Sequence, residues 1–401
     1  MKILLINNCH YRRGGADAVY LNTAELLIKK GHEVLYFALD DINNEQNNFS
    51  KHFPKSIDFR SLSFLNKISS IKSFVYNKDV KQKLSDFIKE NKPDIAHIHL
   101  FMGGLTVSIL DALKENNIPI IHTVHDYRLI CPAYTLLDRK NKICESCKDG
   151  FYLRCASKKC SLEGKFSHSF MLMLDAYYRK YFKNTLKSID KFIFVSQFAK
   201  NKHFEFDKNF ESKSTVLYNF KSGVFRKSDS RGDYLFFYGR LSREKGIETL
   251  VLCAKKLGVK LKIAGTGPLL EDLKKQSNNN IEVLGYKSGD ELWNLITQSS
   301  YVVVPSEWYE NNPLTIVESF CLGKPVIGSN VGGITELIQE ERGFLFEPKN
   351  EDSMLNSLSK AFSLSNEEYF NMSEKVFSFA KNNFSEEANY ESLIKIYNSL
   401  I

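Results

Sequence analysis

The sequence has no apolar run long enough to cross a membrane. Its longest apolar stretches, such as 118–124 and 191–195, have the length of single β-strands, whereas a membrane-spanning helix needs roughly 18 or more apolar residues. The first residues, 1–6, lead directly to Asn7 and Asn8, so we expect them to form a strand and no signal peptide. These features predict a cytoplasmic protein.

The sequence also lacks two common nucleotide-binding motifs. Neither Gly-x-Gly-x-x-Gly nor a Gly-Lys-Ser/Thr phosphate loop occurs, which weighs against a nicotinamide-dependent dehydrogenase and a P-loop nucleotidase. The composition, 43% hydrophobic and 25% charged, is that of an ordinary globular protein. It argues against collagen, disorder and a disulfide-rich miniature scaffold.

The charge is unevenly distributed along the chain. Residues 1–200 carry 31 Lys and Arg against 20 Asp and Glu, a net charge of +11, whereas residues 201–401 carry a net charge of −3. A basic first half indicates an anionic partner. Nucleic acid, an anionic membrane surface and an anionic substrate are all compatible with this asymmetry alone.

Apolar strands alternate with helical segments along the whole chain. This pattern predicts an α/β fold with parallel sheets covered on both faces. The length of 401 residues suggests two or three domains at about 150 residues each. The predicted strands are 2–7, 33–38, 95–99, 119–125, 192–196 and 215–218 in the first half, and 234–238, 261–264, 281–284, 301–304, 325–328 and 344–346 in the second.

A polar linker at 219–233 separates the two runs of strands. We therefore predict an N-terminal domain of residues 1–218, joined by a last helix at 385–401, and a C-terminal domain of residues 219–384. The last helix could pack on either domain.

Two segments follow the first strands of the two domains. Segment 239–246 holds Arg240 and Lys245, which would emerge at the carboxyl end of a parallel sheet, where open α/β folds bind ligands. Both side chains suit a phosphate. In the other domain, Gly14 and Gly15 precede a helix and would let its N-terminus approach a ligand; a tight turn explains two glycines equally well.

Two glutamates accompany a later helix of the second domain. Glu310 precedes this helix and Glu318 lies about one and a half turns into it. Pro313 suits the first helical turn with Asn312 as its cap, which would leave N–H groups free for a ligand. Carboxylates accept hydrogen bonds from sugar or ribose hydroxyls. Surface solvation would explain the pair alone, but its combination with the basic segment favours a binding site.

At these residues the chain resembles the retaining GT-B nucleotide-sugar glycosyltransferases of family 4, the group 1 type. The resemblance covers nearly all 401 residues. The paired glutamates of the family match Glu310 and Glu318. Further matches are Gly239, Arg240, Lys245 and Gly246, the glycine-rich turn 264–268, and Gly332 and Gly333 with Glu336.

The resemblance implies a fold and an activity. It implies two Rossmann-like doubly wound domains that face a central crevice. Separately from the resemblance, residues 131–160 show little apolar periodicity and hold five cysteines, so we predict a Cys-rich insertion in the first domain after the strand that ends at His125. It also implies transfer of a sugar from a UDP- or GDP-sugar to a glycan or a lipid-linked saccharide, in the synthesis of a surface polysaccharide, lipopolysaccharide or glycolipid. The chain would then be cytoplasmic, with peripheral contact at the inner face of the plasma membrane.

The resemblance also implies roles for individual residues. Arg240 and Lys245 would hold the donor diphosphate, Glu310 the donor sugar and Glu318 the nucleotide ribose. His125, which follows an N-domain strand, would contact the donor sugar. The other implied donor-binding residues are Gly14, Gly15, Asn219, Gly239, Gly265, Gly267, Asn311, Asn312, Pro313 and Leu314.

No Asp-x-Asp sequence occurs, so the metal–diphosphate motif of the other glycosyltransferase fold is missing and no catalytic metal is expected. Fixed cations and a helix N-terminus would stabilise the departing diphosphate. The family implies a front-face mechanism in which the leaving phosphate helps deprotonate the acceptor. No glutamate then needs to be a covalent nucleophile, in contrast to retaining glycosidases.

Two other functions fit parts of the sequence. A nucleotide-sugar enzyme other than a transferase, such as an epimerase, is disfavoured by the complete set of Arg240, Lys245, Glu310 and Glu318. A zinc-containing nucleic-acid-binding protein would use the basic half. Because no finger-type His pair or recognition motif is evident, we expect no nucleic-acid partner.

Five of the eight cysteines fall between 131 and 160. The spacing of Cys144, Cys147, Cys155 and Cys160 suits a tetrahedral thiolate site for structural zinc. Free thiols and an iron–sulfur cluster are the alternatives.

Aromatic and basic residues interleave at near-helical spacing between 164 and 187. A helix packed on its own sheet would explain the aromatic positions. The alternative is a surface helix resting on anionic lipid, which would suit a lipid-linked acceptor.

Overall fold

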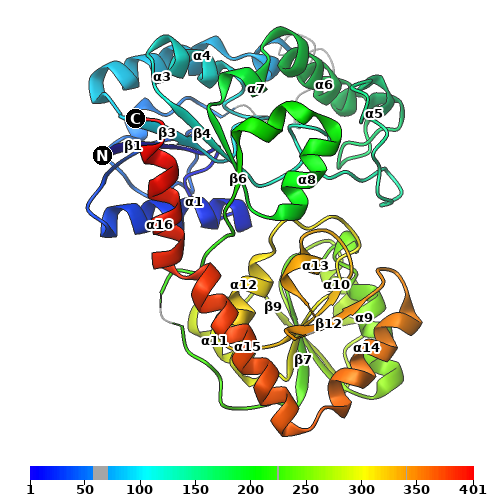
Figure 1. The fold of residues 1–401 in the computed structure, drawn as a ribbon. Coiled ribbons are helices and arrows are strands. Elements are labelled where there is room, and N and C mark those ends of the chain that lie inside the picture. The colour runs from blue at the N-terminus through cyan, green and yellow to red at the C-terminus, as the bar shows by residue number, and fades with distance from the viewer. Residues whose placement is uncertain (57–70, 224, 340) are drawn as a thin grey trace. The chain divides into compact units, whose positions relative to one another are not determined.

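The computed structural model describes residues 1–56, 71–223, 225–339 and 341–401. The chain forms two compact units, an N-terminal unit of Met1–Leu217 with Tyr390–Ile401 and a C-terminal unit of Tyr218–Asn389 (Figure 1). The linker predicted at 219–233 includes Val224, which lies outside the described residues. None of the described helices combines the length and apolar character needed to span a bilayer.

The N-terminal unit is built on a parallel sheet with the strand order β2-β1-β3-β4-β5-β6. Its strands are β1 (Lys2–Ile6), β2 (Glu33–Phe37), β3 (Ile95–Ile98), β4 (Ile120–Val124), β5 (Lys191–Phe194) and β6 (Ser214–Val216). Its helices are α1 (Gly15–Lys29), η1 (Ser50–His52), α3 (Lys78–Asn91), α4 (Ser108–Glu115), α5 (Leu153–Ser157), α6 (Phe166–Tyr177), η2 (Tyr178–Phe182), α7 (Thr185–Ser188), α8 (Gln197–Phe206), η3 (Lys208–Lys213) and α16 (Glu386–Asn398), which enters this unit from the C-terminal unit.

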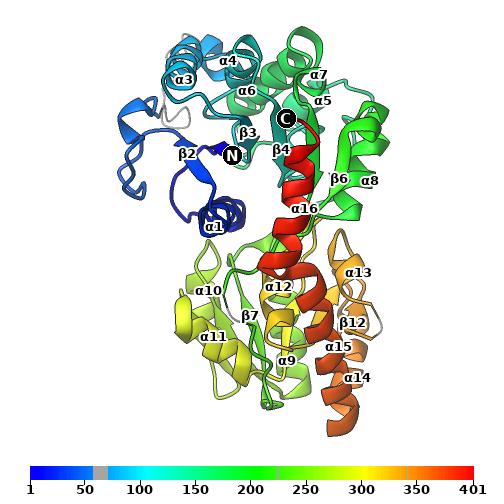
Figure 2. The same ribbon diagram turned by 60° about the vertical axis from the view of Figure 1, so that its left-hand side comes forward.

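Both faces of this sheet are covered by helices. Tyr20 and Leu27 of α1 pack with Ile3 and Ile95 of the strands on one face, where Leu393 and Tyr397 of α16 join them. Helices α3 and α4 lie on the other face (Figure 2). The predicted last helix therefore packs on the N-terminal unit. The chain reverses its direction of strand addition between β1 and β3, so the loops after these two strands flank a switch point, where α/β sheets bind ligands.

The C-terminal unit contains a second parallel sheet with the order β12-β11-β10-β7-β8-β9. Its strands are β7 (Tyr234–Tyr238), β8 (Lys260–Ala264), β9 (Ile281–Gly285), β10 (Tyr301–Val304), β11 (Val326–Ser329) and β12 (Gly343–Phe346). Its helices are η4 (Arg243–Lys245), α9 (Ile247–Leu257), α10 (Leu270–Lys274), α11 (Gly289–Gln298), α12 (Leu314–Cys321), α13 (Ile334–Leu337), α14 (Glu351–Ser363) and α15 (Asn366–Phe384).

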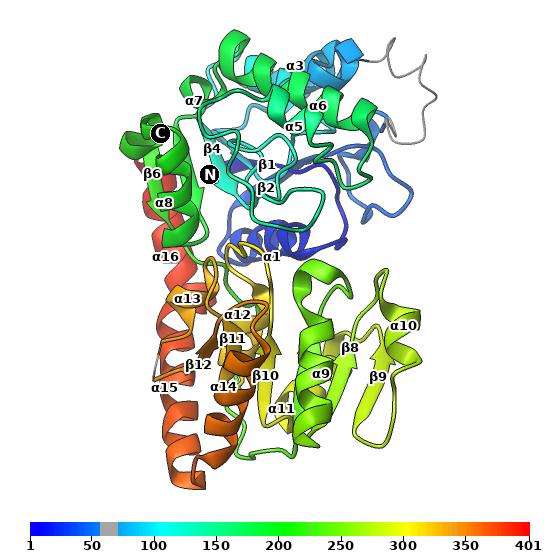
Figure 3. The same cartoon turned by 90° about the vertical axis from the view of Figure 1, so that its right-hand side faces the viewer.

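Two apolar clusters sandwich this second sheet. Residues of α9 and α14 cover one face, including Leu250 and Leu358. Residues of α12 and α15 cover the other, including Phe320 and Phe384 (Figure 3). The switch point lies between β7 and β10. Each predicted strand of both units is present, with ends that differ from the prediction by at most two residues.

Candidate active site

The loops after β7 and β10 bring Lys245 and Glu310 together at the switch point of the C-terminal unit. The Lys245 ammonium donates to Glu310 Oε1 at 2.5 Å. The same oxygen accepts from Ser306 Oγ and from Trp308 Nε1, each at 2.7 Å. Glu310 is 8% exposed. A buried carboxylate is therefore held by one ammonium and two neutral donors.

This environment keeps Glu310 ionised. Burial alone would raise the pKa of Glu310, but the ammonium of Lys245 and the three hydrogen bonds outweigh it and hold the pKa below its usual range. Lys245 also lies 5.2 Å from the centroid of the Trp308 ring, a cation–π distance. The sequence analysis assigned no role to Ser306 or Trp308, although both lie within five residues of Glu310. Their hydrogen bonds to Glu310 are seen only in the structure.

Two glycine elements fix the loop that carries Glu310. A Cβ atom on Gly333 would lie 1.7 Å from the carbonyl oxygen of Asn311, and one on Gly246 would lie 1.9 Å from that of Pro305. Gly333 also donates its N–H to Glu310 O at 2.7 Å. Gly332 adopts φ +63°, a conformation that favours glycine. The motif at 332–333 therefore supports the glutamate loop through backbone contact.

A second pair of loops is fastened in the same manner. Gly239 donates its N–H to Ala264 O, and Leu241 donates to Thr266 O. A Cβ on Gly265 would lie 1.8 Å from Gly239 O. Gly267 likewise approaches Leu241 closely, since its Cβ would lie 2.4 Å from Leu241 O. Gly265 and Gly267 are therefore required by the close approach of the two loops, independently of any ligand.

Arg240 emerges from these loops into solvent. It is exposed, and its guanidinium forms no hydrogen bond or ion pair with any residue that the structure describes. The structure therefore leaves this cation available, but it does not bring Arg240 into contact with Lys245 or Glu310.

The start of α12 differs from the prediction. Pro313 occupies the N-cap position with ψ 120°, and the helix begins at Leu314. Asn312 is not the cap, because its Oδ1 accepts from Asn219 N at 3.0 Å while its carbonyl accepts from Asn219 Nδ2 at 2.9 Å. Asn219 Oδ1 and Asn312 Nδ2 are buried without partners among the described residues. Two orphaned polar atoms thus lie beside the start of α12.

Glu318 forms a separate contact within the same unit. Its Oε2 accepts from Tyr238 Oη at 2.9 Å. Burial raises the pKa of Glu318 to about 7, although the hydrogen bond from Tyr238 and the charge of Lys221 act in the opposite direction. The group therefore titrates near neutral pH, and the two glutamates of the motif differ in protonation.

In the N-terminal unit, Gly14 is the N-cap residue of α1 and Gly15 is its first residue. A Cβ on Gly14 would meet Asp17 Oδ2 at 3.7 Å, an ordinary contact, and the backbone of Gly14 is extended. Asp17 accepts from Asn7 Nδ2 at 2.8 Å, and burial raises its pKa. Packing within this unit therefore does not demand a glycine at position 14.

His125 follows β4 and contacts a second histidine that the sequence did not single out. His99 Nδ1 lies 2.9 Å from His125 Nε2, and the two rings stack at 5.1 Å. Burial lowers the pKa of His125 to about 3 and that of His99 well below its ordinary value. Both rings are neutral at physiological pH, so in their hydrogen bond one ring donates and the other accepts.

The four cysteines of the predicted zinc site lie around one small cavity. Its lining includes Cys144, Cys147, Cys155 and Cys160, together with Cys131. All are free thiols, and burial raises the pKa of Cys147 to about 12. No group of three or more His, Cys, Asp or Glu in the described residues is placed to ligate a metal ion. The cluster exists, and zinc binding stays a prediction.

The aromatic and basic segment 164–187 is not one helix. It consists of α6, η2 and α7, and Asn184 interrupts it with φ +42°. Met171 and Leu172 pack inward. Three aromatic side chains are turned to solvent: Phe166 is 53%, Tyr181 61% and Phe182 79% exposed.

Comparison with known proteins assigns the family. Residues 13–220 match the model described as Glycosyltransferase Family 4, and residues 224–397 match the model described as glycosyl transferases group 1. The chain belongs to this group 1, family 4 class of glycosyltransferases, and it is an enzyme that transfers glycosyl groups. The family match favours this activity over the epimerase and the nucleic-acid-binding interpretations.

Individual relatives agree. The chain is 29% identical over 357 residues to an uncharacterized 42.6 kDa protein in the cps region of Klebsiella pneumoniae, with 84% of this chain and 87% of that protein covered. It is 30% identical over 170 residues to the lipopolysaccharide 1,2-N-acetylglucosaminetransferase of Salmonella typhimurium, with 38% and 44% covered. HepE of Anabaena, solved in complex with UDP and glucose, has a TM-score of 0.67 at 16% identity, with both chains covered completely. This likeness supports the GT-B fold.

Proposed function

We propose that this enzyme is a retaining glycosyltransferase that uses a nucleotide-sugar donor, a UDP- or GDP-sugar. The observation that carries the proposal is the pairing of Lys245 with the buried Glu310 at the β7–β10 switch point. Switch points are where open α/β sheets bind nucleotides. HepE, which shares the fold, was solved with UDP.

In the proposed donor site, basic groups bind the diphosphate and carboxylates bind the sugar and the ribose. Lys245 and the exposed Arg240 would meet the charge that develops on the departing diphosphate, and the N-terminus of α12 would add its dipole. Glu310 would accept hydrogen bonds from the donor sugar through its second oxygen. Glu318 would bind the ribose. The leaving phosphate would help to deprotonate the acceptor, so Glu310 would remain a binding group.

In the N-terminal unit, Gly14 and Gly15 would face the donor diphosphate, and His125 would contact the donor sugar. A side chain at position 14 would fit within this unit, so packing does not require a glycine there. Close approach of a ligand to the backbone would require one, which supports this role. The neutral state of His125 suits a hydrogen-bonding partner rather than a fixed charge.

The proposed acceptor is a glycan or a lipid-linked saccharide in surface polysaccharide or glycolipid synthesis. The relatives from the cps region of Klebsiella pneumoniae and from lipopolysaccharide synthesis in Salmonella typhimurium support this assignment. The exposed Phe166 and Phe182 would rest on an anionic membrane, together with the exposed Lys165 of the same segment.

A thermal-shift screen with UDP-, GDP-, ADP- and dTDP-sugars tests the donor site. One of these sugars should stabilise the protein, because a ligand that binds the folded state raises its stability by an amount set by its concentration over Kd. Lys245→Met should abolish this shift. Lys260→Met is the matched control, because Lys260 forms an exposed ion pair with Asp233 in the same unit. Equal shifts in both variants would contradict the assigned site.

Co-sedimentation with vesicles tests the membrane contact. Wild type should sediment with vesicles that contain phosphatidylglycerol and not with pure phosphatidylcholine. Phe182→Ser should weaken this binding, whereas Tyr286→Ser should not, since Tyr286 is equally exposed, at 71%, but lies in the C-terminal unit. No difference between the two vesicle types would remove the membrane proposal.

A further inference from the structure

The N-terminal unit contains a cavity of about 390 Å³ that none of the roles above uses. Its walls come from the end of α6 with η2 and α7, from the end of α8 with η3, and from the connection between β4 and α6, which supplies Leu129, Ile130, Lys148 and Tyr152. The volume falls in the range of roughly 300–1,000 Å³ typical of small-molecule sites. The cavity can therefore hold a ligand about as large as one or two sugar units.

The lining is strongly basic. Among the described residues that line the cavity, five carry a positive charge and one is a carboxylate: Lys148, Arg179, Lys180, Lys187, Lys213 and Asp207. Asp207 caps η3, where it accepts from Asn209 N at 3.0 Å and from Asn209 Nδ2 at 2.8 Å. The carboxylate thus has donors of its own, and the excess charge favours an anion.

Three of the five cations, Lys213, Lys148 and Arg179, already contact neighbouring groups. Lys213 Nζ donates to three carbonyl oxygens at the end of α7, the shortest at 2.8 Å to Ile189. Lys148 pairs with Glu205 at 3.3 Å. Lys180 and Lys187, in contrast, form no ion pair with a carboxylate in the described part of the chain. These two ammonium groups are the ones available to a ligand.

Arg179 adds an unsatisfied donor to the same wall. It is only 4% exposed. Its Nε donates to Asp175 and its Nη1 to the carbonyl of Arg128, each at 2.9 Å. Its Nη2 is buried and has no hydrogen-bond partner among the described residues. Leaving a buried charged donor without a partner is costly, so a cavity ligand that accepts from Nη2 would satisfy it.

Aromatic rings lie next to these cations. Lys180 Nζ lies 5.9 Å from the centroid of the Tyr152 ring and 5.7 Å from that of the Tyr181 ring. Both rings line the cavity; Tyr152 is buried, whereas Tyr181 is 61% exposed. An exposed ring face can cover the apolar face of a sugar, while ammonium groups bind phosphate as point charges.

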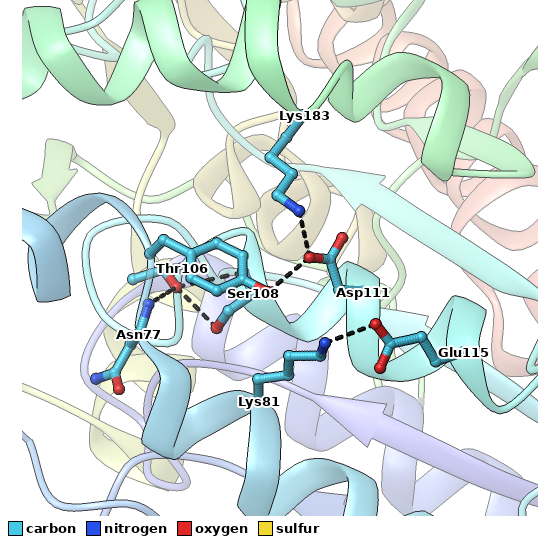
Figure 4. Close-up of polar contacts among 8 residues, drawn as sticks. Asn77, Lys81, Thr106, Ser108, Asp111, Glu115 and Lys183 are labelled. Atoms are coloured by element: carbon cyan, nitrogen blue, oxygen red, sulfur yellow. Dashed lines mark hydrogen bonds and ion pairs between the residues drawn. The ribbon is translucent and has the colours of Figure 1, made fainter.

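The wall that carries these groups is held in place without a ligand. Lys183, which follows η2, contacts Asp111 of α4 (Figure 4). Tyr76, which precedes α3, contacts the same carboxylate. Tyr76 Oη donates to Asp111 at 2.6 Å. Because η2 is fastened to α4 by this contact, the cavity is preorganised, which lowers the entropy cost of binding.

From the cavity, its excess cations and the adjoining ring, we propose that this site binds a phosphorylated saccharide. The saccharide would be the phosphate-bearing part of the acceptor. The assignment of the ligand to the acceptor rests on the proposed function, whereas the proposal that the cavity binds a phosphorylated saccharide does not. The same chemistry can be supplied by a free sugar phosphate or by the head of a lipid-linked sugar.

Calorimetric titration with glucose 6-phosphate, glucose and inorganic phosphate tests the site. Glucose 6-phosphate should bind best, and its affinity should fall as salt is raised, since exposed charges are screened. Replacing both available cations, Lys180→Gln with Lys187→Gln, should weaken binding at least tenfold. Lys208→Gln is the matched control, because Lys208 is an exposed cation of η3 that does not line the cavity.

Three results would separate the claims. Equal binding of glucose 6-phosphate by wild type and the double variant would overturn the site. Unchanged UDP-sugar binding in the double variant supports a site distinct from the donor site. In a transfer assay the double variant should raise the KM for the acceptor and leave the KM for the donor unchanged; an unchanged acceptor KM would overturn the acceptor assignment.

The two ligand sources are distinguished with vesicles. Phosphatidylcholine vesicles that carry a polyprenyl phosphate sugar should compete with glucose 6-phosphate if the lipid-linked head is the ligand. Without competition, the free sugar phosphate is the ligand. Tyr181→Ala should reduce the preference for glucose 6-phosphate over inorganic phosphate, and an unchanged preference would contradict the role given to the ring.

Discussion

The close contact between Gly333 and Asn311 makes a sharp test of how Glu310 is positioned. In the variant Gly333→Ala, the new Cβ would lie 1.7 Å from Asn311 O, whereas ordinary contacts begin near 3.4 Å. Gly333 has φ −71°, which alanine adopts freely. The overlap of the new Cβ with Asn311 O is therefore the only unfavourable change that the substitution introduces. The loop must move by more than an ångström, and misplacement on that scale costs about 100-fold in kcat/KM.

Gly258→Ala is the matched control for this variant. Gly258 caps α9 of the same unit with φ +65°, and no atom lies within 4 Å of its Cβ position. The left-handed conformation should cost about 1 kcal/mol of stability without loss of activity. Relief of the overlap in Gly333→Ala should cost about 1–3 kcal/mol. Denaturant unfolding gives the stabilities, and product formation gives kcat/KM. Near-wild-type kcat/KM in Gly333→Ala would refute the positioning role.

Four further predictions concern the charged and polar groups. Lys245→Met should lower the free energy of unfolding by about 2–3 kcal/mol, because Glu310 loses its ammonium but keeps the donors Ser306 and Trp308. Adding Glu310→Gln should recover much of this loss in urea unfolding, and an additive further loss would contradict the pairing. Since burial raises the pKa of Glu318 from 4.5 to about 7, the folded state holds a proton that the unfolded state has released, so stability should fall by up to about 3 kcal/mol as pH rises from roughly 5 to 8; Glu318→Gln should flatten this slope, and an unchanged slope would rule out Glu318 as its source. His99→Phe removes the hydrogen bond that orients His125, so it should lower kcat about tenfold with little change in the donor KM. His99→Gln should recover part of this loss. An equal loss in both variants would indicate that His99 acts through packing. Elemental analysis of protein purified in metal-free buffer should find about one zinc per chain if the cysteine cluster ligates metal, whereas stoichiometric free thiols without metal would reject the site.

The strands, and the segments that carry Lys245 and Glu310, could be recognised in the sequence because each depends on neighbouring residues. Apolar runs of strand length alternate with helices, so the two sheets follow from local pattern and from the tendency of such units to form parallel sheets. Gly246 and Gly333 were visible as glycines near the motif. Their function as close-contact positions depends on backbone atoms of other loops, which no local pattern reveals.

Two differences from the sequence predictions, and one contact that the sequence did not reveal, have physical causes. Asn312 was expected to cap α12, but its Oδ1 instead accepts a hydrogen bond from the backbone N–H of Asn219, 93 residues away. The pairing of His99 with His125 joins two strands that the sequence separates by 26 residues. The basic segment was expected to be one helix, yet Asn184 interrupts it. In each case a tertiary hydrogen bond or a positive φ decided the outcome.

In the proposed function, the loops that carry Lys245 and Glu310 bind the donor of a retaining transfer. The most direct measurement is NMR analysis of the product formed from the nucleotide sugar that stabilises the enzyme, with wild type and Lys245→Met compared. We predict a product whose anomeric configuration matches that of the donor, and no product from the variant. Inverted configuration, or equal product from Lys245→Met, would contradict the account.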